Sequence, residues 1–131
     1  MAELNKVTKA LLFADNAHKE QKRKNSNLPY IFHPIQVYHL LRMVSDDQDV
    51  LIAGLLHDTI EDCGITYDEI KHQFGDRVAN LVKEVTNDNQ GNPQLKTKEG
   101  LMIKLVDILH NISDNNDTPY LKKKIKFVEG I

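Results

Sequence analysis

The sequence predicts an all-α fold, a bundle of about six or seven helices in one domain spanning residues 1–131. Apolar residues recur at intervals of three and four through most of the chain, which is the spacing of a helix face. No segment shows the strict apolar–polar alternation of a half-buried strand. Clusters of turn-forming residues separate the apolar segments, as expected for helices joined by short loops.

Two amphipathic helices are predicted in the first third of the chain. Apolar residues at helical spacing mark the first, namely Leu4, Val7, Leu11 and Ala14. The polar stretch 19–27 and the following residues LPYIFHP are predicted to form a loop. Pro34 suits the first turn of the second helix, because its fixed φ and missing N–H are tolerated there.

The segment DVLIAGLLHDTIEDCG, residues 49–64, is predicted to be one central, buried helix. It is apolar nearly all round before His57, which is typical of a helix surrounded by other helices. Gly64 is suited to end it. Thr66 and Glu69 have the spacing of a capping box, so a further helix is expected from there to Gly75.

The remainder of the chain predicts two longer helices and a short closing one. The first carries Val78, Leu81, Val82 and Val85, and the loop NDNQGNP (87–93) follows it. The second runs through GLMIKLVDILHNI, with an apolar stripe predicted at Leu101, Leu105, Ile108 and Ile112. The tail TPYLKKKIKFVEGI, residues 118–131, is expected to add a short helix.

The composition argues against several classes of function. A net charge of -2 provides no positive field that would attract nucleic acid. No apolar run reaches the length of a membrane span, and the first residues become polar too soon for a secretory signal. Cys63 is the single cysteine, so no internal disulfide forms and a cytoplasmic location is expected. The sequence does not determine the oligomeric state.

Charged residues within the apolar segment 49–64 predict a bound cation. His57, Asp58, Glu61 and Asp62 interrupt it, and no Lys or Arg lies in the same segment. Burying an unpaired carboxylate costs on the order of several kcal/mol, so a divalent cation is the expected compensation. On one continuous helix, His57 and Glu61 would be one turn apart, as would Asp58 and Asp62.

One helix cannot surround a cation, so ligands from other segments are expected. His33 stands at the entry of the second helix, and Asp107 lies among apolar neighbours in a later one. His33, His57, Asp58 and Asp107 together offer two imidazole nitrogens and two carboxylates. This mixture suits Mn(II) or Fe(II), and after them Mg(II) or Zn(II), while the lack of thiolates argues against a structural zinc site.

The order of these four residues resembles the signature of HD-domain phosphohydrolases. RKNSNLPYIFHP, LLHDTIEDCGITYDEI and KLVDILHNI are similar to three successive motifs of the RelA/SpoT hydrolase domain, and the resemblance runs from about Ala17 to Ile112. That domain removes the 3′-pyrophosphate of the alarmone (p)ppGpp, leaving GDP or GTP. The resemblance implies an HD-type hydrolase with a small nucleotide substrate and Mn(II) as the expected metal.

The resemblance also implies roles for five further residues. Glu61 and Asp62 would orient and deprotonate the attacking water. Arg23 would lie against the nucleobase, Lys24 would help to neutralise phosphate charge, and Asn111 would contact the ribose. Proton acceptance by a positioned carboxylate is the chemistry that such a hydrolysis requires.

Departures from the family pattern leave alternative functions open. The loop 87–99 is shorter than in the family, where a longer connection contributes basic residues, although it retains Lys96 and Lys98. Ser113 stands where the family carries an arginine. The alternatives are an HD phosphohydrolase acting on another nucleotide phosphate ester, and a non-catalytic nucleotide- or metal-binding module. Outside the set of site residues, Tyr30 is expected to pack, and the histidines His18, His39, His72 and His110 are expected to be structural or exposed.

Overall fold

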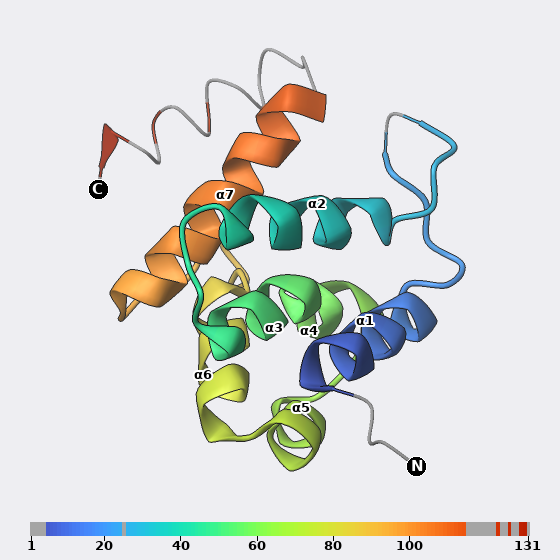
Figure 1. Cartoon of the computed structure of the whole chain (residues 1–131). Coiled ribbons are helices and arrows are strands. Elements are labelled where there is room, and N and C mark those ends of the chain that lie inside the picture. The colour runs from blue at the N-terminus through green and yellow to red at the C-terminus, as the bar shows by residue number, and fades with distance from the viewer. Residues whose placement is uncertain (1–4, 25, 115–122, 124–125, 127–128, 131) are drawn as a thin grey trace.

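The computed structural model describes residues 5–24, 26–114, 123, 126 and 129–130. Over these residues the chain forms α-helices and no strand, which confirms the predicted all-α fold (Figure 1). Two isolated bridges, Lys22–Pro29 and Asn87–Pro93, each join the two ends of a loop. The helices are α1 (Lys6–Ala17), α2 (Phe32–Arg42), α3 (Gln48–Leu56), α4 (Thr59–Cys63), α5 (Tyr67–Phe74), α6 (Asp76–Val85) and α7 (Lys98–Asp114).

Helix α3 lies at the centre of the bundle and contacts α1, α2, α6 and α7 (Figure 1). Every residue from Val50 to Leu56 is buried, as the apolar pattern predicted. Gly54 allows α2 to approach closely, because a Cβ at this position would collide with the side chain of Leu41. His57 and Asp58 directly follow the carboxyl end of this buried helix, and His57 is itself buried.

The segment 49–64 is not one helix, so the sequence prediction is wrong here. Helix α3 ends at Leu56, and a turn at His57 and Asp58 separates it from α4. Asp58 has φ -102° and ψ 0°, outside the helical range. The Thr59 hydroxyl donates to the carbonyl of Leu56 at 2.8 Å, a local bond of the kind that competes with helix continuation.

The predicted boundaries around α5 are confirmed. Gly64 ends α4 in the left-handed conformation, with φ 70°, which side chains rarely adopt. The hydroxyl of Thr66 accepts the backbone N–H of Glu69 at 3.1 Å, which is half of the expected capping box. Gly75, with φ 96°, turns the chain between α5 and α6.

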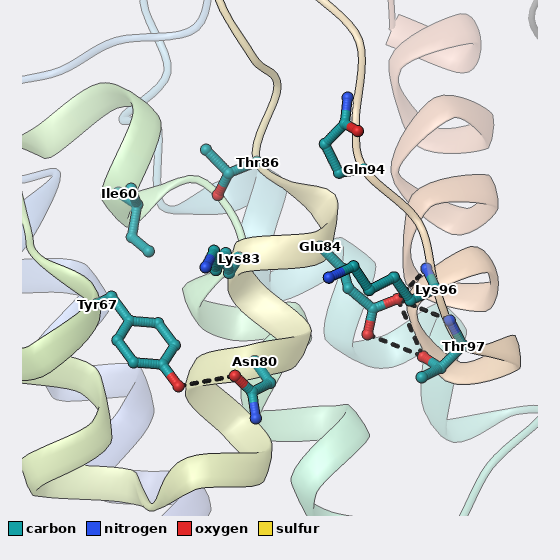
Figure 2. A pocket seen from close by; sticks show the side chains of 9 residues that line it. All are labelled: Ile60, Tyr67, Asn80, Lys83, Glu84, Thr86, Gln94, Lys96 and Thr97. Carbon is teal, nitrogen blue, oxygen red and sulfur yellow. Dashed lines mark hydrogen bonds between the residues drawn. The ribbon is translucent and has the colours of Figure 1, made fainter.

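Glu84 on α6 holds the following loop in place (Figure 2). Its buried carboxylate accepts the backbone N–H groups of Lys96 at 2.6 Å and Thr97 at 2.8 Å, and also the Thr97 hydroxyl. The backbone N–H of Gln94 donates to the Glu84 carbonyl at 3.1 Å. These bonds fix the loop against α6 and determine where α7 begins.

Helix α7 packs against α2 and α6 with a face that is partly polar. Its buried residues are Gly100, Ile103, Lys104, Asp107 and Ile108. Leu105, predicted to be buried, is 37% exposed, because Lys104 and Asp107 occupy the inward face and find polar partners there. The closing helix predicted for 118–131 falls largely on residues outside the described part. Within the described part, no helix is both long and apolar enough to cross a membrane.

Candidate metal centre

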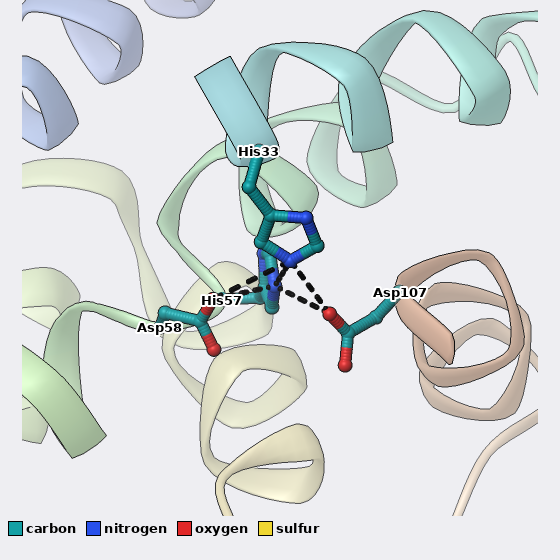
Figure 3. Close-up of side chains that lie close together, drawn as sticks. All are labelled: His33, His57, Asp58 and Asp107. Carbon is teal, nitrogen blue, oxygen red and sulfur yellow. Dashed lines mark hydrogen bonds and ion pairs between the residues drawn. The ribbon is translucent and has the colours of Figure 1, made fainter. Parts of the chain in front are cut away.

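His33, His57, Asp58 and Asp107 converge on one point in the interior (Figure 3). One nitrogen or oxygen atom from each lies within 4.8 Å of the other three. The first turn of α2 supplies His33, the turn between α3 and α4 supplies His57 and Asp58, and the middle of α7 supplies Asp107. The structure thus brings together the four residues that the sequence indicated as ligands, although they come from three separate segments.

The facing atoms are Nε2 of both histidines and one oxygen of each aspartate. Nε2 of His33 lies 2.7 Å from Oδ1 of Asp107, and Nε2 of His57 lies 3.1 Å from the same oxygen. Oδ2 of Asp58 lies 2.9 Å from Nε2 of His57 and 3.6 Å from Nε2 of His33. The two Nε2 atoms are 3.2 Å apart.

The outer nitrogens of the two histidines have partners that turn Nε2 inward. Nδ1 of His57 lies 2.7 Å from the Gly54 carbonyl, which can only accept, so Nδ1 carries the proton and donates. Once Nε2 has lost its proton, its lone pair points into the cluster, the arrangement found in metal-binding histidines. Nδ1 of His33 lies 2.7 Å from Nδ1 of His110, so one of these rings donates to the other.

The charges of the cluster favour a cation. Burial lowers the pKa of His33 and keeps that ring neutral. Burial acts likewise on His57, but the charges of Asp58 and Asp107 outweigh it and raise the pKa well above its ordinary value. Burial opposes ionisation of the two aspartates, yet His57 lowers the pKa of Asp58 to about 2 and that of Asp107 well below its usual range. Two buried carboxylates beside two imidazole nitrogens therefore fit a divalent cation.

Glu61 and Asp62 follow the cluster on α4, and both are exposed. Their exposure contradicts the sequence prediction that these two carboxylates are buried. Oε1 of Glu61 accepts the backbone N–H of Asn87 at 3.0 Å, and Oδ2 of Asp62 accepts the side-chain amide of Gln21 at 3.4 Å. Partial burial and the charge of Asp58 raise the pKa of Asp62, which makes this carboxylate a better proton acceptor.

Arg23 and Asn111 meet beside the cluster, whereas Lys24 does not join them. Arg23 donates to Oδ1 of Asn111 at 3.0 Å, and Nδ2 of Asn111 donates to Oδ1 of Asp107 at 3.1 Å. The guanidinium also lies 5.5 Å from the centre of the Tyr30 ring. Lys24 is exposed, and it has no hydrogen bond or ion pair within residues 5–24 and 26–114.

A separate hollow of about 700 Å³ lies along α6 (Figure 2). Side chains from α4, α5, α6 and the loop before α7 line it, and they include Lys83 and Lys96. None of its lining residues belongs to the four-residue cluster or to the Arg23–Asn111 pair. Lys96 therefore lines a different part of the surface from the cluster.

Comparisons with known proteins agree with this geometry. Residues 10–100 match the family model described as HD domain. Proteins from Homo sapiens and Mus musculus named guanosine-3′,5′-bis(diphosphate) 3′-pyrophosphohydrolase MESH1 are each 36% identical over 130 residues, covering 88% of this chain and 72% of theirs. The chain belongs to the HD-domain family and is MESH1-like.

Two further relatives are longer than this chain. An Aquifex aeolicus protein named guanosine-3′,5′-bis(diphosphate) 3′-pyrophosphohydrolase is 50% identical over 80 residues, which are 61% of this chain but 11% of that protein. A solved structure described as a metazoan ortholog of SpoT that hydrolyzes ppGpp superposes with a TM-score of 0.74. It is 30% identical, and the match covers 87% of this chain and 72% of that one.

The four-residue cluster has neighbours that the sequence did not single out. The Tyr30 hydroxyl, expected only to pack, donates to Oδ2 of Asp58 at 2.6 Å, and burial together with Asp58 raises the pKa of this phenol so that it keeps its proton. His110 lies against His33, and Lys104 lies 3.6 Å from Asp107. Lys104 and His110 stand three positions before and after Asp107, a spacing that puts all three on one helix face. No comparable pattern marks Tyr30.

Proposed function

We propose that this chain is a metal-dependent hydrolase that removes the 3′-pyrophosphate of (p)ppGpp and yields GDP or GTP with pyrophosphate. The observation that carries the proposal is the convergence of His33, His57, Asp58 and Asp107 in a chain 36% identical to MESH1. In this reaction water adds to the phosphorus bound to the ribose 3′ oxygen, and that oxygen leaves and gains a proton. Residues 1–131 are proposed to form one hydrolase domain.

The four clustered residues would hold the cation, for which Mn(II) is the proposed identity. A cation bound there would lower the pKa of a coordinated water and stabilise negative charge on the phosphoryl oxygens. Two imidazole nitrogens and two carboxylate oxygens leave coordination positions for water, which supports Mn(II) or Fe(II) over a closed tetrahedral zinc site.

Glu61 and Asp62 are proposed to orient the attacking water and accept its proton. Both are exposed, so substrate and water have access to them. Glu61 is held by the Asn87 N–H through Oε1, which leaves Oε2 available to bind water. The raised pKa of Asp62 supports its role as a proton acceptor.

Arg23, Lys24 and Asn111 are proposed to bind the nucleotide. The guanidinium of Arg23 offers a flat cationic surface to a guanine base, and Asn111, bonded to Asp107, is suited to contact the ribose next to the reacting phosphorus. Lys24 is exposed and would neutralise phosphate charge. A net charge of -2 supports a small nucleotide, bound by local charges, over nucleic acid as the partner.

Incubation of the Mn(II)-loaded chain with ppGpp tests the proposal. Pyrophosphate and GDP should appear in equal amounts, and His57→Ala should abolish both. Because the variant differs only in a proposed ligand, any residual release measures contamination. Absence of pyrophosphate release with Mn(II), Fe(II), Mg(II) and Zn(II) would exclude this activity and favour a nucleotide-binding module.

Hydrolysis of another nucleotide phosphate ester is the second candidate. The loop between α6 and α7 closes through the Asn87–Pro93 bridge, and α7 starts at Lys98, so little chain is available to form a basic wall over the substrate. Ser113 also lacks the charge that the family pattern has at its position. A panel of nucleoside 2′-, 3′- and 5′-phosphates, assayed beside ppGpp, distinguishes the two candidates.

A further inference from the structure

Lys104 is a buried lysine beside the metal centre. It is 5% exposed and lies on α7 one turn before Asp107. Its Nζ is 3.6 Å from Oδ2 of Asp107, the oxygen that points away from the two histidines, and 3.3 Å from Oδ1 of Asn87. Lysine is rarely buried without partners, because removing an ammonium group from water is costly. These two contacts are therefore what holds Lys104 in the interior.

Asn87 connects Lys104 to Glu61 through two hydrogen bonds. Its side chain accepts from Lys104, and its own backbone N–H donates to Oε1 of Glu61 at 3.0 Å. Asn87 directly follows the extended residue Thr86, where the chain leaves α6. Within the described residues, this N–H is the hydrogen-bond donor that holds the exposed Glu61 carboxylate. A shift of Asn87 would therefore move Glu61.

We propose that Lys104 is a positioning residue, which acts through Asn87 to fix Glu61 relative to Asp107. One ammonium group contacts a residue of the metal centre directly and, through Asn87, fixes the carboxylate that is proposed to orient the attacking water. The spacing between metal ligand and proton acceptor thus depends on a contact between α7 and the loop after α6. The catalytic consequence rests on the proposed function, whereas the coupling of Lys104 to Glu61 does not.

A purely structural role for Lys104 makes a different prediction. If Lys104 contributes only packing, its replacement by a side chain of similar length lowers global stability. The hydrogen bond between Asn87 and Glu61 is then unchanged. Lys104→Met keeps the apolar stem and removes the donor, so it separates the two roles. Asn87→Ala breaks the same connection at a less buried position, which provides a second variant if Lys104→Met does not fold.

Amide hydrogen exchange of the metal-free protein, followed by NMR, tests the coupling without any activity. Protection of the amide at position 87 should fall by about tenfold in Lys104→Met, which is the size of effect of one lost hydrogen bond. Glu61→Ala, which removes the acceptor, should cause a similar fall. Lys6→Met changes an exposed lysine on α1 and serves as the control. The amide of Ile52 in the centre of α3 reports global stability and corrects for any general loss.

Steady-state kinetics with ppGpp test the catalytic consequence. Lys104→Met and Asn87→Ala should each lower kcat by about tenfold or more with little change in KM, and bound-metal content should persist. The double variant should be no slower than the slower single variant, because both changes break one pathway. Lys104→Arg, which keeps a charged donor, should recover part of the loss.

Two results would overturn the proposal. One is unchanged protection of the position 87 amide in Lys104→Met after correction by Ile52. The other is a multiplicative loss of kcat in the double variant, which would mean that Lys104 and Asn87 act independently. If the protein does not hydrolyse ppGpp at all, the proposed function fails, but the exchange measurement still decides whether Lys104 positions Glu61.

Discussion

At the scale of single residues, the proposed chemistry depends on which atom each histidine turns inward. His57 donates through Nδ1 to the Gly54 carbonyl, a backbone group of the helix that precedes it. That carbonyl keeps a proton on Nδ1, so Nε2 is the nitrogen that can bind a cation once it is deprotonated. Tyr30 holds Asp58 differently, because its hydroxyl donates to Oδ2, the oxygen that faces the two histidines. The orientation of both ligands is thus set by hydrogen bonds to neighbours that are not in the ligand set.

Replacement of a proposed ligand should remove the bound metal. We expect His57→Ala and Asp107→Ala to retain little Mn(II) after loading and dialysis, because each loses one of four donors. Metal analysis of folded protein provides the measurement. The control is His72→Ala, an exposed histidine on α5, which should bind as much metal as the parent. Equal metal content in all three variants would refute the ligand set.

Replacing the two exposed carboxylates of α4 should lower the rate of hydrolysis without changing metal binding. We expect Glu61→Gln and Asp62→Asn to lower kcat by about 10²–10⁴-fold, the usual size of general-base assistance, while metal content is unchanged. Asp68→Asn, an exposed aspartate on α5, is the matched control and should leave kcat unaltered. Near-parental turnover in both amide variants would place the proton acceptor elsewhere.

At the scale of elements, the start of α3 is fastened to the start of α6. Asp47 caps α3 by accepting the Asp49 N–H at 3.1 Å, and Arg77 donates to both oxygens of Asp47, at 2.8 and 2.6 Å. Arg77 also donates to Asp49 at 3.2 Å. Because α3 carries the metal-centre turn at its other end, this pairing helps to fix where that turn lies.

The pairing of Asp47 with Arg77 should stabilise the fold in a pH-dependent way. The hydrogen bond from Arg77 holds the pKa of Asp47 below its ordinary 3.8, so the native state favours the ionised form. Stability from this source is present above that ordinary pKa and is lost as the pH falls through the lowered one. Arg77→Met should lower the free energy of unfolding by about 0.5–1 kcal/mol at pH 7, because the pair is partly exposed.

Urea unfolding of the parent and the variant, measured from pH 7 downward, tests this expectation. The difference between the two proteins should shrink once the pH passes below 4. Lys6→Met, an exposed lysine without an ion pair in the described residues, should differ from the parent by little at any pH. A difference that stays constant across the range would assign the effect of Arg77 to packing.

At the scale of the whole molecule, helices from separate parts of the chain enclose the metal centre. Helices α2, α3 and α7 surround the cluster, and the loop after α6 is held against its own helix by Glu84. Lys96 consequently lines the hollow along α6, apart from Arg23 and Asn111. The chain therefore contributes fewer positive charges to the substrate than a longer loop would supply.

This architecture predicts turnover of ppGpp with weak binding. Compared with a family member that has the longer basic loop, we expect a higher KM and a similar kcat, because losing ground-state contacts leaves the chemical step unchanged. Arg23→Ala should raise KM further, by about two- to thirtyfold, since a guanidinium against a flat ring contributes about 0.5–2 kcal/mol. The measurement is kcat/KM for ppGpp against GDP, GTP and nucleoside 2′- or 3′-monophosphates under Mn(II). A tenfold preference for a monophosphate would reassign the substrate within the HD-domain family.

The sequence by itself determined the helical class, the buried centre and the identity of the four clustered residues. Helical periodicity and helix caps depend on residues three or four positions apart, so they can be recognised along the chain. The four residues stood out because histidines and carboxylates in apolar surroundings need a common partner. The glycines at 64 and 75 marked helix ends for an equally local reason, their tolerance of positive φ.

Only the tertiary structure decided how those residues meet. The helix break at His57 and Asp58 cannot be recognised from the spacing of apolar residues. It is accompanied by side-chain hydrogen bonds from His57 to the Gly54 carbonyl and from Thr59 to the Leu56 carbonyl, which leave that spacing unchanged. The exposure of Leu105 followed from polar contacts made by its neighbour Lys104. Contacts such as that of Asn87 with Glu61 join separate elements. They are decided by packing, since spacing along the chain does not set which loop residue lies beside which helix.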